Sequence, residues 1–255
     1  MTRNPLIIAH RGESHDAPEN TLASVNLAWE RGVPAVEIDV RVTCDRIPVV
    51  IHNATTGHMA GRDWTVSRRS FADLRTLDFG RRRGAAWTGQ KIPTLEEVLD
   101  TVPESGRLFL EIKVGTEAVP PIQKAIRRSR IRNGQVSLIA FRRPVLLAAA
   151  VAMPRCDACW IVDLKRRPDQ DPAKEASRLA RITRADGLAA INAGLDAESD
   201  LAIIPALQSH GLKVYAWTIN DRFLARRLIR VGIDGITSDR AAWLRQGLRD
   251  ALNKP

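Results

Sequence analysis

Two histidines and three carboxylates stand at the ends of short apolar runs in the first half of the chain. They occur in Ala9-His10-Arg11-Gly12, Glu37-Ile38-Asp39, Ile51-His52 and Leu110-Glu111-Ile112-Lys113. Carboxylate oxygens bind hard divalent cations, and histidine exchanges protons near neutral pH. These side chains could therefore hold a metal ion and two proton-transfer groups around a phosphate.

The spacing of the carboxylates predicts that they share one side of a sheet. Alternation along a strand places Glu37, Asp39 and Arg41 on one face, and Glu111 and Lys113 repeat the pattern on a later strand. Buried unpaired carboxylates are costly, and a divalent cation removes that cost. Three oxygen ligands favour Mg²⁺ or Ca²⁺ over zinc. The alternative is a structural salt-bridge cluster of the same carboxylates with Arg11, Arg41 and Lys113.

The two histidines suit general acid–base chemistry. His10 ends the first expected strand and His52 ends a short strand before a long polar segment. Cleavage of a phosphodiester needs a base for the nucleophile and an acid for the leaving alkoxide, and one histidine could serve each role. The remaining histidines, His15, His58 and His210, are expected to lie outside the chemistry.

Apolar β-branched runs alternate with stretches at helical spacing along the whole chain. The expected strands are Leu6–Ala9, Val36–Val42, Ile47–Ile51, Leu108–Ile112, Val136–Ala140, Trp160–Val162, Gly187–Ala190, Val214–Thr218 and Gly235–Thr237. The expected helices are Thr21–Arg31, Thr94–Val102, Ile122–Ser129, Val145–Ala152, 173–184, Ala197–His210, Arg222–Val231 and Ala241–Leu252. Asn20, Thr94 and either Asn220 or Asp221 are expected helix caps.

Eight such alternations predict an α/β fold, a TIM (β/α)8 barrel with strand ends gathered at one rim. We expect residues 1–255 to form a single domain. The polar segment 53–90 is too long for a simple βα loop, and we interpret it as a small insertion after the second strand that lies over the barrel mouth.

Composition limits the possible partners. The net charge of +10 favours anions, although the arginine runs Arg81–Arg83, Arg127–Arg128 and Arg166–Arg167 are typical of solvated faces. No nucleic-acid motif, membrane-spanning run or secretory leader is evident, so we expect a cytoplasmic protein with no stable membrane anchor. Cys156 and Cys159 form one C-x-x-C, a weak zinc signal, and reduced thiols are expected.

The ordered set of motifs closely resembles the glycerophosphodiester phosphodiesterases. The resemblance runs from residue 8 to about 240 and rests on His10-Arg11-Gly12, Pro18-Glu19-Asn20-Thr21, Glu37-Ile38-Asp39-Val40, Val49-Val50-Ile51-His52, Ile92-Pro93-Thr94-Leu95-Glu96-Glu97, Leu110-Glu111-Ile112-Lys113, Ala216-Trp217-Thr218-Ile219-Asn220 and Asp234-Gly235-Ile236-Thr237-Ser238-Asp239. It implies a TIM barrel that binds one Mg²⁺ or Ca²⁺ and acts on a small phosphodiester.

The resemblance also implies roles for individual residues. Positions matching Glu37, Asp39 and Glu111 hold the metal, and those matching His10 and His52 are the general acid and base. Arg11 and Lys113 match residues that contact the phosphate. Trp217 matches an aromatic residue that lines the pocket beside the alcohol, and Glu19 could orient nearby groups or serve the structure alone.

Two departures from the family pattern concern this same rim. Asn53 follows His52 where the family usually has Asp, and Asp45-Arg46 replaces an Asp-Gly turn whose glycine would supply a positive φ. The expected function is hydrolysis of glycerophosphodiesters to an alcohol and glycerol phosphate. The alternatives are a lysophospholipase D-like activity on lysolipids and a binding protein without turnover.

Overall fold

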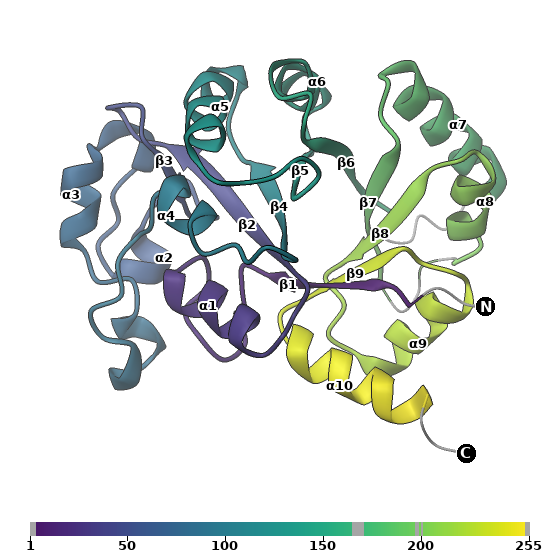
Figure 1. Cartoon of the computed structure of the whole chain (residues 1–255), viewed down its shortest axis with the longest axis horizontal. Coiled ribbons are helices and arrows are strands. Elements are labelled where there is room, and N and C mark those ends of the chain that lie inside the picture. Colours follow the sequence, from purple (N-terminus) through teal and green to yellow (C-terminus); the bar gives the residue numbers. More distant parts are fainter. Residues whose placement is uncertain (1–3, 165–170, 197–198, 200, 253–255) are drawn as a thin grey trace.

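Eight parallel strands close into a barrel. Helices lie around the outside of this barrel (Figure 1). The computed structural model describes residues 4–164, 171–196, 199 and 201–252. The strand order is β1-β9-β8-β7-β6-β5-β4-β2, and a β1–β2 pairing completes the ring, so the predicted TIM barrel is confirmed. Strand β3 is antiparallel to β2 and lies outside the parallel ring.

The elements follow the predicted alternation. The strands are β1 (Leu6–His10), β2 (Ala35–Val42), β3 (Pro48–Val50), β4 (Arg107–Ile112), β5 (Val136–Ala140), β6 (Asp157–Asp163), β7 (Ala190–Gly194), β8 (Lys213–Trp217) and β9 (Gly235–Ser238). The helices that surround the barrel include α1 (Leu22–Glu30), α4 (Leu95–Leu99), α5 (Val119–Arg128), α6 (Arg143–Ala152), α7 (Pro172–Ala185), α8 (Ile203–Ser209), α9 (Arg222–Arg230) and α10 (Ala241–Leu252). Among the described residues, no helix is both long enough and apolar enough to cross a membrane.

The barrel interior is apolar at its base and acidic toward the carboxyl ends of the strands. Ile8, Phe109, Ile139, Ile161 and Tyr215 belong to a buried interior cluster, in which the rings of Phe109 and Tyr215 meet edge to face at 5.3 Å. Because side chains alternate along a strand, the next inward positions on β1, β2 and β4 are polar. The apolar base therefore supports a polar layer above it, at the end of the barrel where functional loops gather.

The segment between β3 and α4 folds into short helical pieces. These are α2 (Gly57–Ala60), η1 (Val66–Arg68), α3 (Phe71–Thr76), η2 (Arg81–Arg83) and η3 (Ala85–Trp87). They enclose a small apolar core of their own, built from Val49, Ile51, Val66, Leu74, Phe79 and Ile92. Arg75 donates to both oxygens of Glu97, at 2.9 and 2.7 Å, and so ties the segment to α4.

Most expected boundaries hold within a few residues, and the differences have local causes. The capping box of Thr94 and Glu97 is confirmed, and Asp221 caps α9. The cap of α1 is Thr21, so the prediction for Asn20 is wrong. The strand expected at Gly187–Ala190 begins only at Ala190, because Gly187 turns the chain with φ +70° after α7.

Some expectations fall partly beyond the described residues or need correction. The helix expected over Ala197–His210 is α8 from Ile203, while residues 197, 198 and 200 are outside the described part, as are Arg166 and Arg167. Arg46 itself takes a φ of +63°, the backbone that glycine would supply in this turn. Its guanidinium donates to the Glu117 carbonyl at 2.8 Å, which ties this turn to the loop that follows β4.

Candidate active site

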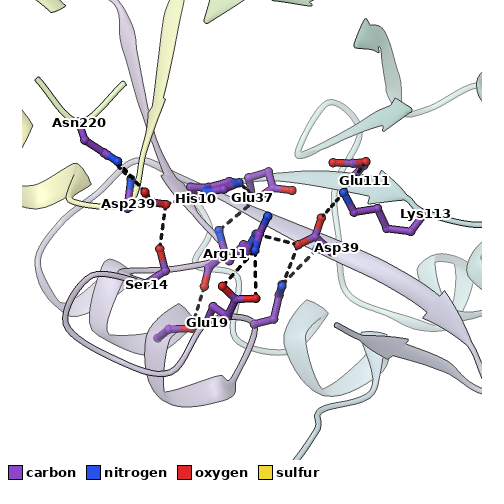
Figure 2. Close-up of polar contacts among 12 residues, drawn as sticks. His10, Arg11, Ser14, Glu19, Glu37, Asp39, Glu111, Lys113, Asn220 and Asp239 are labelled. Atoms are coloured by element: carbon purple, nitrogen blue, oxygen red, sulfur yellow. Dashed lines mark hydrogen bonds and ion pairs between the residues drawn. The ribbon is translucent and has the colours of Figure 1, made fainter. Parts of the chain in front are cut away.

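The register of three parallel strands gathers the polar residues at one place. His10 on β1 is paired with Glu37 on β2, and Asp39 on β2 is paired with Glu111 on β4. One carboxylate oxygen from each of Glu37, Asp39 and Glu111 lies within 4.8 Å of the others, and all three residues are buried. In the described chain this is the one group of three or more potential metal ligands. Figure 2 shows Glu37 and Asp39 between His10 on one side and Glu111 on the other.

Two cations neutralise the cluster in part. Lys113 Nζ lies 2.8 Å from Glu111 Oε1 and 3.1 Å from Asp39 Oδ1, and Arg11 Nε lies 3.1 Å from Asp39 Oδ2. Burial raises the pKa of Asp39, but the charges of Lys113 and Arg11 outweigh burial and hold that pKa below its usual value. These contacts agree with part of the salt-bridge alternative. The Arg41 guanidinium, by contrast, donates to the His52 carbonyl at 2.8 Å and forms no ion pair with the three carboxylates.

The remaining charge of the cluster fits a divalent cation. Two cations face three carboxylates, and burial together with the charge of Asp39 raises the pKa of Glu37 to about 8. Within the described residues, Glu37 Oε1 is buried without a hydrogen-bond donor, and Asp39 Oδ1 is buried with the Lys113 ammonium 3.1 Å away. Buried polar atoms normally have a partner, so Glu37 Oε1 in particular is suited to ligate a cation.

A network of hydrogen bonds fixes His10 beside this cluster. His10 Nδ1 lies 2.6 Å from Asp239 Oδ1, and its Nε2 lies 3.9 Å from Glu37 Oε2. Asp239 also accepts from Ser14 Oγ at 3.2 Å and from the Asn220 amide at 2.6 Å. Burial lowers the pKa of His10, but the bond to Asp239 and the charge of Glu37 outweigh it and raise the pKa above the usual value.

His52 has a partner of a different kind. Its Nδ1 lies 2.7 Å from the side-chain oxygen of Asn53, which accepts a hydrogen bond and carries no charge. Burial lowers the pKa of His52, and the charge of Asp39 offsets that effect only in part. His52 is therefore poised as a neutral imidazole near neutral pH, with Nδ1–H donated to Asn53.

The loop between β1 and α1 carries the residues that orient Arg11 and Asp39. Arg11 has a φ of +57° and donates through Nη1 to both oxygens of Glu19, at 3.0 Å each. The Asn20 amide donates to Asp39 Oδ2 at 2.8 Å and accepts from the Asp39 backbone N–H at 3.1 Å. A Cβ on Gly12 would lie 2.4 Å from the Ser24 backbone, so this tight loop requires glycine there.

Trp217 lies at the carboxyl end of β8. Its indole N–H donates to the Asn192 carbonyl at 3.1 Å, and its ring meets Phe141 edge to face at 5.6 Å. Phe141 follows β5 directly and is 46% exposed, so the pair presents apolar surface at the same rim as the histidines. Packing against Phe141 accounts for part of the conformation of Trp217.

Several residues of the network lie outside the predicted catalytic, metal-binding and substrate-binding set. Asp239, Asn220 and Ser14 hold His10, while Asn20 holds Asp39. Asn220 and Asp239 belong to motifs that carried the family resemblance, and an Asp directly after a barrel strand was the available signal. His15 is exposed and pairs with Asp16, and the partly exposed His210 directly follows α8, so neither joins the cluster. Cys156 and Cys159 carry free thiols.

A parallel barrel with buried carboxylates and two histidines at its carboxyl-terminal rim has the architecture of an enzyme. The Glycerophosphoryl diester phosphodiesterase family matches residues 10–242 of the chain. The chain therefore belongs to this family of enzymes, as its motifs predicted.

Individual relatives are similar over nearly the full length. The chain is 28% identical over 243 residues to a glycerophosphodiester phosphodiesterase of Caldanaerobacter subterraneus, covering 92% of this chain and 93% of the relative. It is 26% identical over 250 residues to one from Bacillus subtilis, covering 91% and 82%. A phosphodiesterase from Oleispira antarctica, solved with the product sn-glycerol-3-phosphate, superposes with a TM-score of 0.86 at 27% identity and covers 96% and 97%.

Proposed function

We propose that the protein hydrolyses glycerophosphodiesters to an alcohol and glycerol phosphate with the help of one Mg²⁺ or Ca²⁺. The observation that carries this proposal is the cluster of Glu37, Asp39 and Glu111, which has an unsatisfied charge and lies beside His10. Family membership and the product held by the Oleispira antarctica relative support the same reaction.

The three carboxylates are the residues that would hold the cation. A bound cation would withdraw electron density from the phosphate oxygens and offset the charge that grows on them in the transition state. Arg11 and Lys113 place two fixed positive charges beside these carboxylates, and we assign them to contact the phosphate. Glu19 keeps the Arg11 guanidinium in place, because both of its carboxylate oxygens accept from Arg11 Nη1.

The different hydrogen-bond partners of the two histidines assign one proton transfer to each. Neutral His52 accepts the proton of the attacking hydroxyl, either the neighbouring hydroxyl of the glycerol or a water, as that oxygen bonds to phosphorus. The bond from phosphorus to the alcohol oxygen breaks, and His10 donates its proton to that oxygen. If the glycerol hydroxyl attacks, a cyclic phosphate forms and water opens it with the two proton transfers reversed.

The rim supplies the surroundings of the substrate in this proposal. Trp217, supported by Phe141, lines the pocket beside the alcohol. We also propose that residues 1–255 act as one domain and that segment 53–90 lies over the barrel mouth. A cytoplasmic location stays a prediction, which fractionation of cells that produce the native chain would test.

The first experiment measures release of glycerol phosphate from a panel of glycerophosphodiesters by chelator-treated protein, with Mg²⁺ or Ca²⁺ added back. We expect turnover to require the cation and to fall at least about a hundredfold in Glu37→Gln and Asp39→Asn, because both remove charge from the cation site. Glu96→Gln is the matched control, because Glu96 is exposed on α4, pairs with Arg128 and does not belong to the carboxylate cluster.

Each outcome separates the candidates. Full turnover after chelation, or normal activity in Glu37→Gln with the fold intact, would contradict the metal assignment. Release of choline from lysophosphatidylcholine but not from glycerophosphocholine would favour the lysophospholipase D-like activity. Calorimetric binding of Mg²⁺ or Ca²⁺ with no hydrolysis of any diester or lysolipid would favour a binding protein.

A further inference from the structure

A cavity of about 260 Å³ lies between the β1–α1 loop and segment 53–90. Neither the carboxylate cluster nor the two histidines line it, so the chemistry proposed above does not account for it. Its polar lining combines Ser14 and Glu19 from the loop with His58, Arg82 and Arg83 from the segment, and Phe79 adds an apolar surface. The cavity has the character of a small-molecule subsite, with apolar surface and a few convergent polar groups.

Two of the lining residues connect the cavity to the active site. Ser14 donates to the same Asp239 oxygen that His10 contacts, at 3.2 Å and 2.6 Å respectively. Glu19 accepts from Arg11, whose Nε lies 3.1 Å from Asp39. Through these two residues the cavity borders the network that holds His10 and Arg11. Since His10 is the group assigned to protonate the leaving alcohol, the oxygen of that alcohol must lie beside His10, with Trp217 on the β8 side of it and the cavity on the side of the β1–α1 loop.

Within the described part of the chain, the arginines of the cavity carry positive charge that no ion pair offsets. Arg82 donates to the Gly57 carbonyl at 3.2 Å, and Arg83 donates to the carbonyls of Ser14 and His15. Among residues 4–164, 171–196, 199 and 201–252, no carboxylate forms an ion pair with either guanidinium. The nearby Glu19 is already engaged by Arg11. A guanidinium favours phosphate oxygens through paired, charge-assisted hydrogen bonds.

We propose that this cavity binds a phosphate group carried by the leaving alcohol, so that the enzyme prefers glycerophosphodiesters with a phosphorylated head group. The inference rests on the proposed function and adds the substrate class to it. Arg82 and Arg83 recognise the second phosphate, while the diester phosphate lies at the carboxylate cluster. Arg82 and Arg83 are specificity residues in this arrangement and take no part in bond breaking.

The test uses two substrates that differ by one phosphate, glycerophosphoinositol and glycerophosphoinositol 4-phosphate. We expect the wild-type protein to show at least about a tenfold higher kcat/KM for the phosphorylated substrate, mainly through a lower KM. Arg82→Gln is expected to remove most of this preference while changing turnover of glycerophosphoinositol by less than about threefold. Arg82→Lys, which keeps the charge, is expected to retain part of the preference.

Arg81→Gln is the matched control, because Arg81 belongs to the same 3-10 turn but does not line the cavity. It removes the same charge from the same turn and is expected to leave the ratio of kcat/KM values unchanged. Raising the ionic strength from about 0.05 M to about 0.5 M should shrink the wild-type preference, because salt screens exposed charges.

The outcomes distinguish this inference from the proposed function. Hydrolysis of both substrates at equal kcat/KM, or an equal loss on both in Arg82→Gln, would overturn the phosphate subsite and leave the reaction class in place. If Arg81→Gln changed the ratio of kcat/KM values as much as Arg82→Gln, the preference would arise from general surface charge. That result would also overturn the phosphate subsite. No hydrolysis of either substrate by metal-loaded protein would instead overturn the proposed function.

Discussion

The two histidines of the site have the same chemistry but opposite surroundings. His10 meets the carboxylate of Asp239, which in turn is held by Ser14 and Asn220. His52 meets the neutral amide oxygen of Asn53. The pKa of His10 is raised despite burial, while burial lowers the pKa of His52. In the proposed reaction, one neighbouring side chain thus separates the proton donor His10 from the proton acceptor His52.

The difference is built into the fold at two separate places. Asp239 directly follows β9, which pairs with β1, so closure of the barrel brings it to His10 from 229 positions along the chain. Asn53 is adjacent to His52 in sequence and needs no distant contact. A substitution at residue 53 can therefore retune one histidine alone, whereas the setting of His10 depends on the closed barrel.

The largest expected effect comes from removing either histidine. His10→Asn and His52→Asn should each lower kcat by at least about a hundredfold, because each removes a proton-transfer group. The assignment becomes sharper with a p-nitrophenyl ester of glycerol phosphate, whose leaving group needs little protonation. With that substrate we expect the defect of His10→Asn to shrink at least about tenfold, while the defect of His52→Asn persists.

His15→Asn serves as the control, since the His15 side chain is exposed and its hydrogen bond is to the neighbouring Asp16. Its activity should stay near that of the wild type. Near-normal turnover of glycerophosphocholine in either His10→Asn or His52→Asn would sink the division of roles. Equal rescue of both variants by the activated substrate would contradict the assignment of His10 as the acid and His52 as the base.

The next effect concerns the carboxylate partner of His10. Asp239→Asn removes the charge that stabilises the imidazolium, so the pKa of His10 should fall. As the proposed acid, His10 must be protonated, and its activity is lost as the pH rises through its pKa. The alkaline limb of the pH–kcat profile should therefore move to lower pH, with kcat near neutral pH reduced about tenfold.

Asp16→Asn is the matched control for Asp239→Asn. Asp16 contacts the Nδ1 of a histidine at the same 2.6 Å, but that histidine is the exposed His15. Its pH profile should overlay that of the wild type. A loss of activity in Asp239→Asn with no displacement of the alkaline limb would show that Asp239 only supports the structure of the rim.

The sequence predicted the chemistry of the strands better than the chemistry of the loops. Strand periodicity alone placed Glu37, Asp39 and Glu111 on the inside of the barrel, because alternation leaves those side chains no other face. The capping box at Thr94 was likewise a local pattern. The roles of Asp239 and Asn20 could not be predicted this way, because both depend on which distant residue the closed barrel brings beside them.

The loop residues also show why a local pattern can mislead. Asn20 stands where a helix cap is common, but Thr21 caps the helix. The Asn20 side chain instead donates to the Asp39 carboxylate and accepts from the Asp39 backbone N–H. A buried carboxylate gains more from a fixed donor than a helix end gains from one cap among several options. Asn20 thus positions a carboxylate of the site, although local sequence rules would assign it to a helix cap.

The smallest effect tests Asn53, the residue that makes the two histidines differ. Asn53→Asp places a carboxylate on His52 Nδ1 and imitates the surroundings of His10. The imidazolium of His52 becomes more stable, so its pKa should rise. As the proposed base, His52 must be neutral, and its activity is lost as the pH falls through its pKa. The acid limb of the pH–kcat profile should move to higher pH, with kcat at pH 8 within about threefold of the wild type.

Asn53→Ala separates charge from position in this last test. It removes the hydrogen bond to His52 without adding charge, so kcat should fall at all pH values while the acid limb does not rise. The double variant Asn53→Asp/Asp239→Asn should move both limbs toward each other and narrow the active pH range. If Asn53→Asp leaves the acid limb in place while Asp239→Asn displaces the alkaline one, His52 does not act as the base. The contrast between the two histidines would then describe their hydrogen bonds but not their roles.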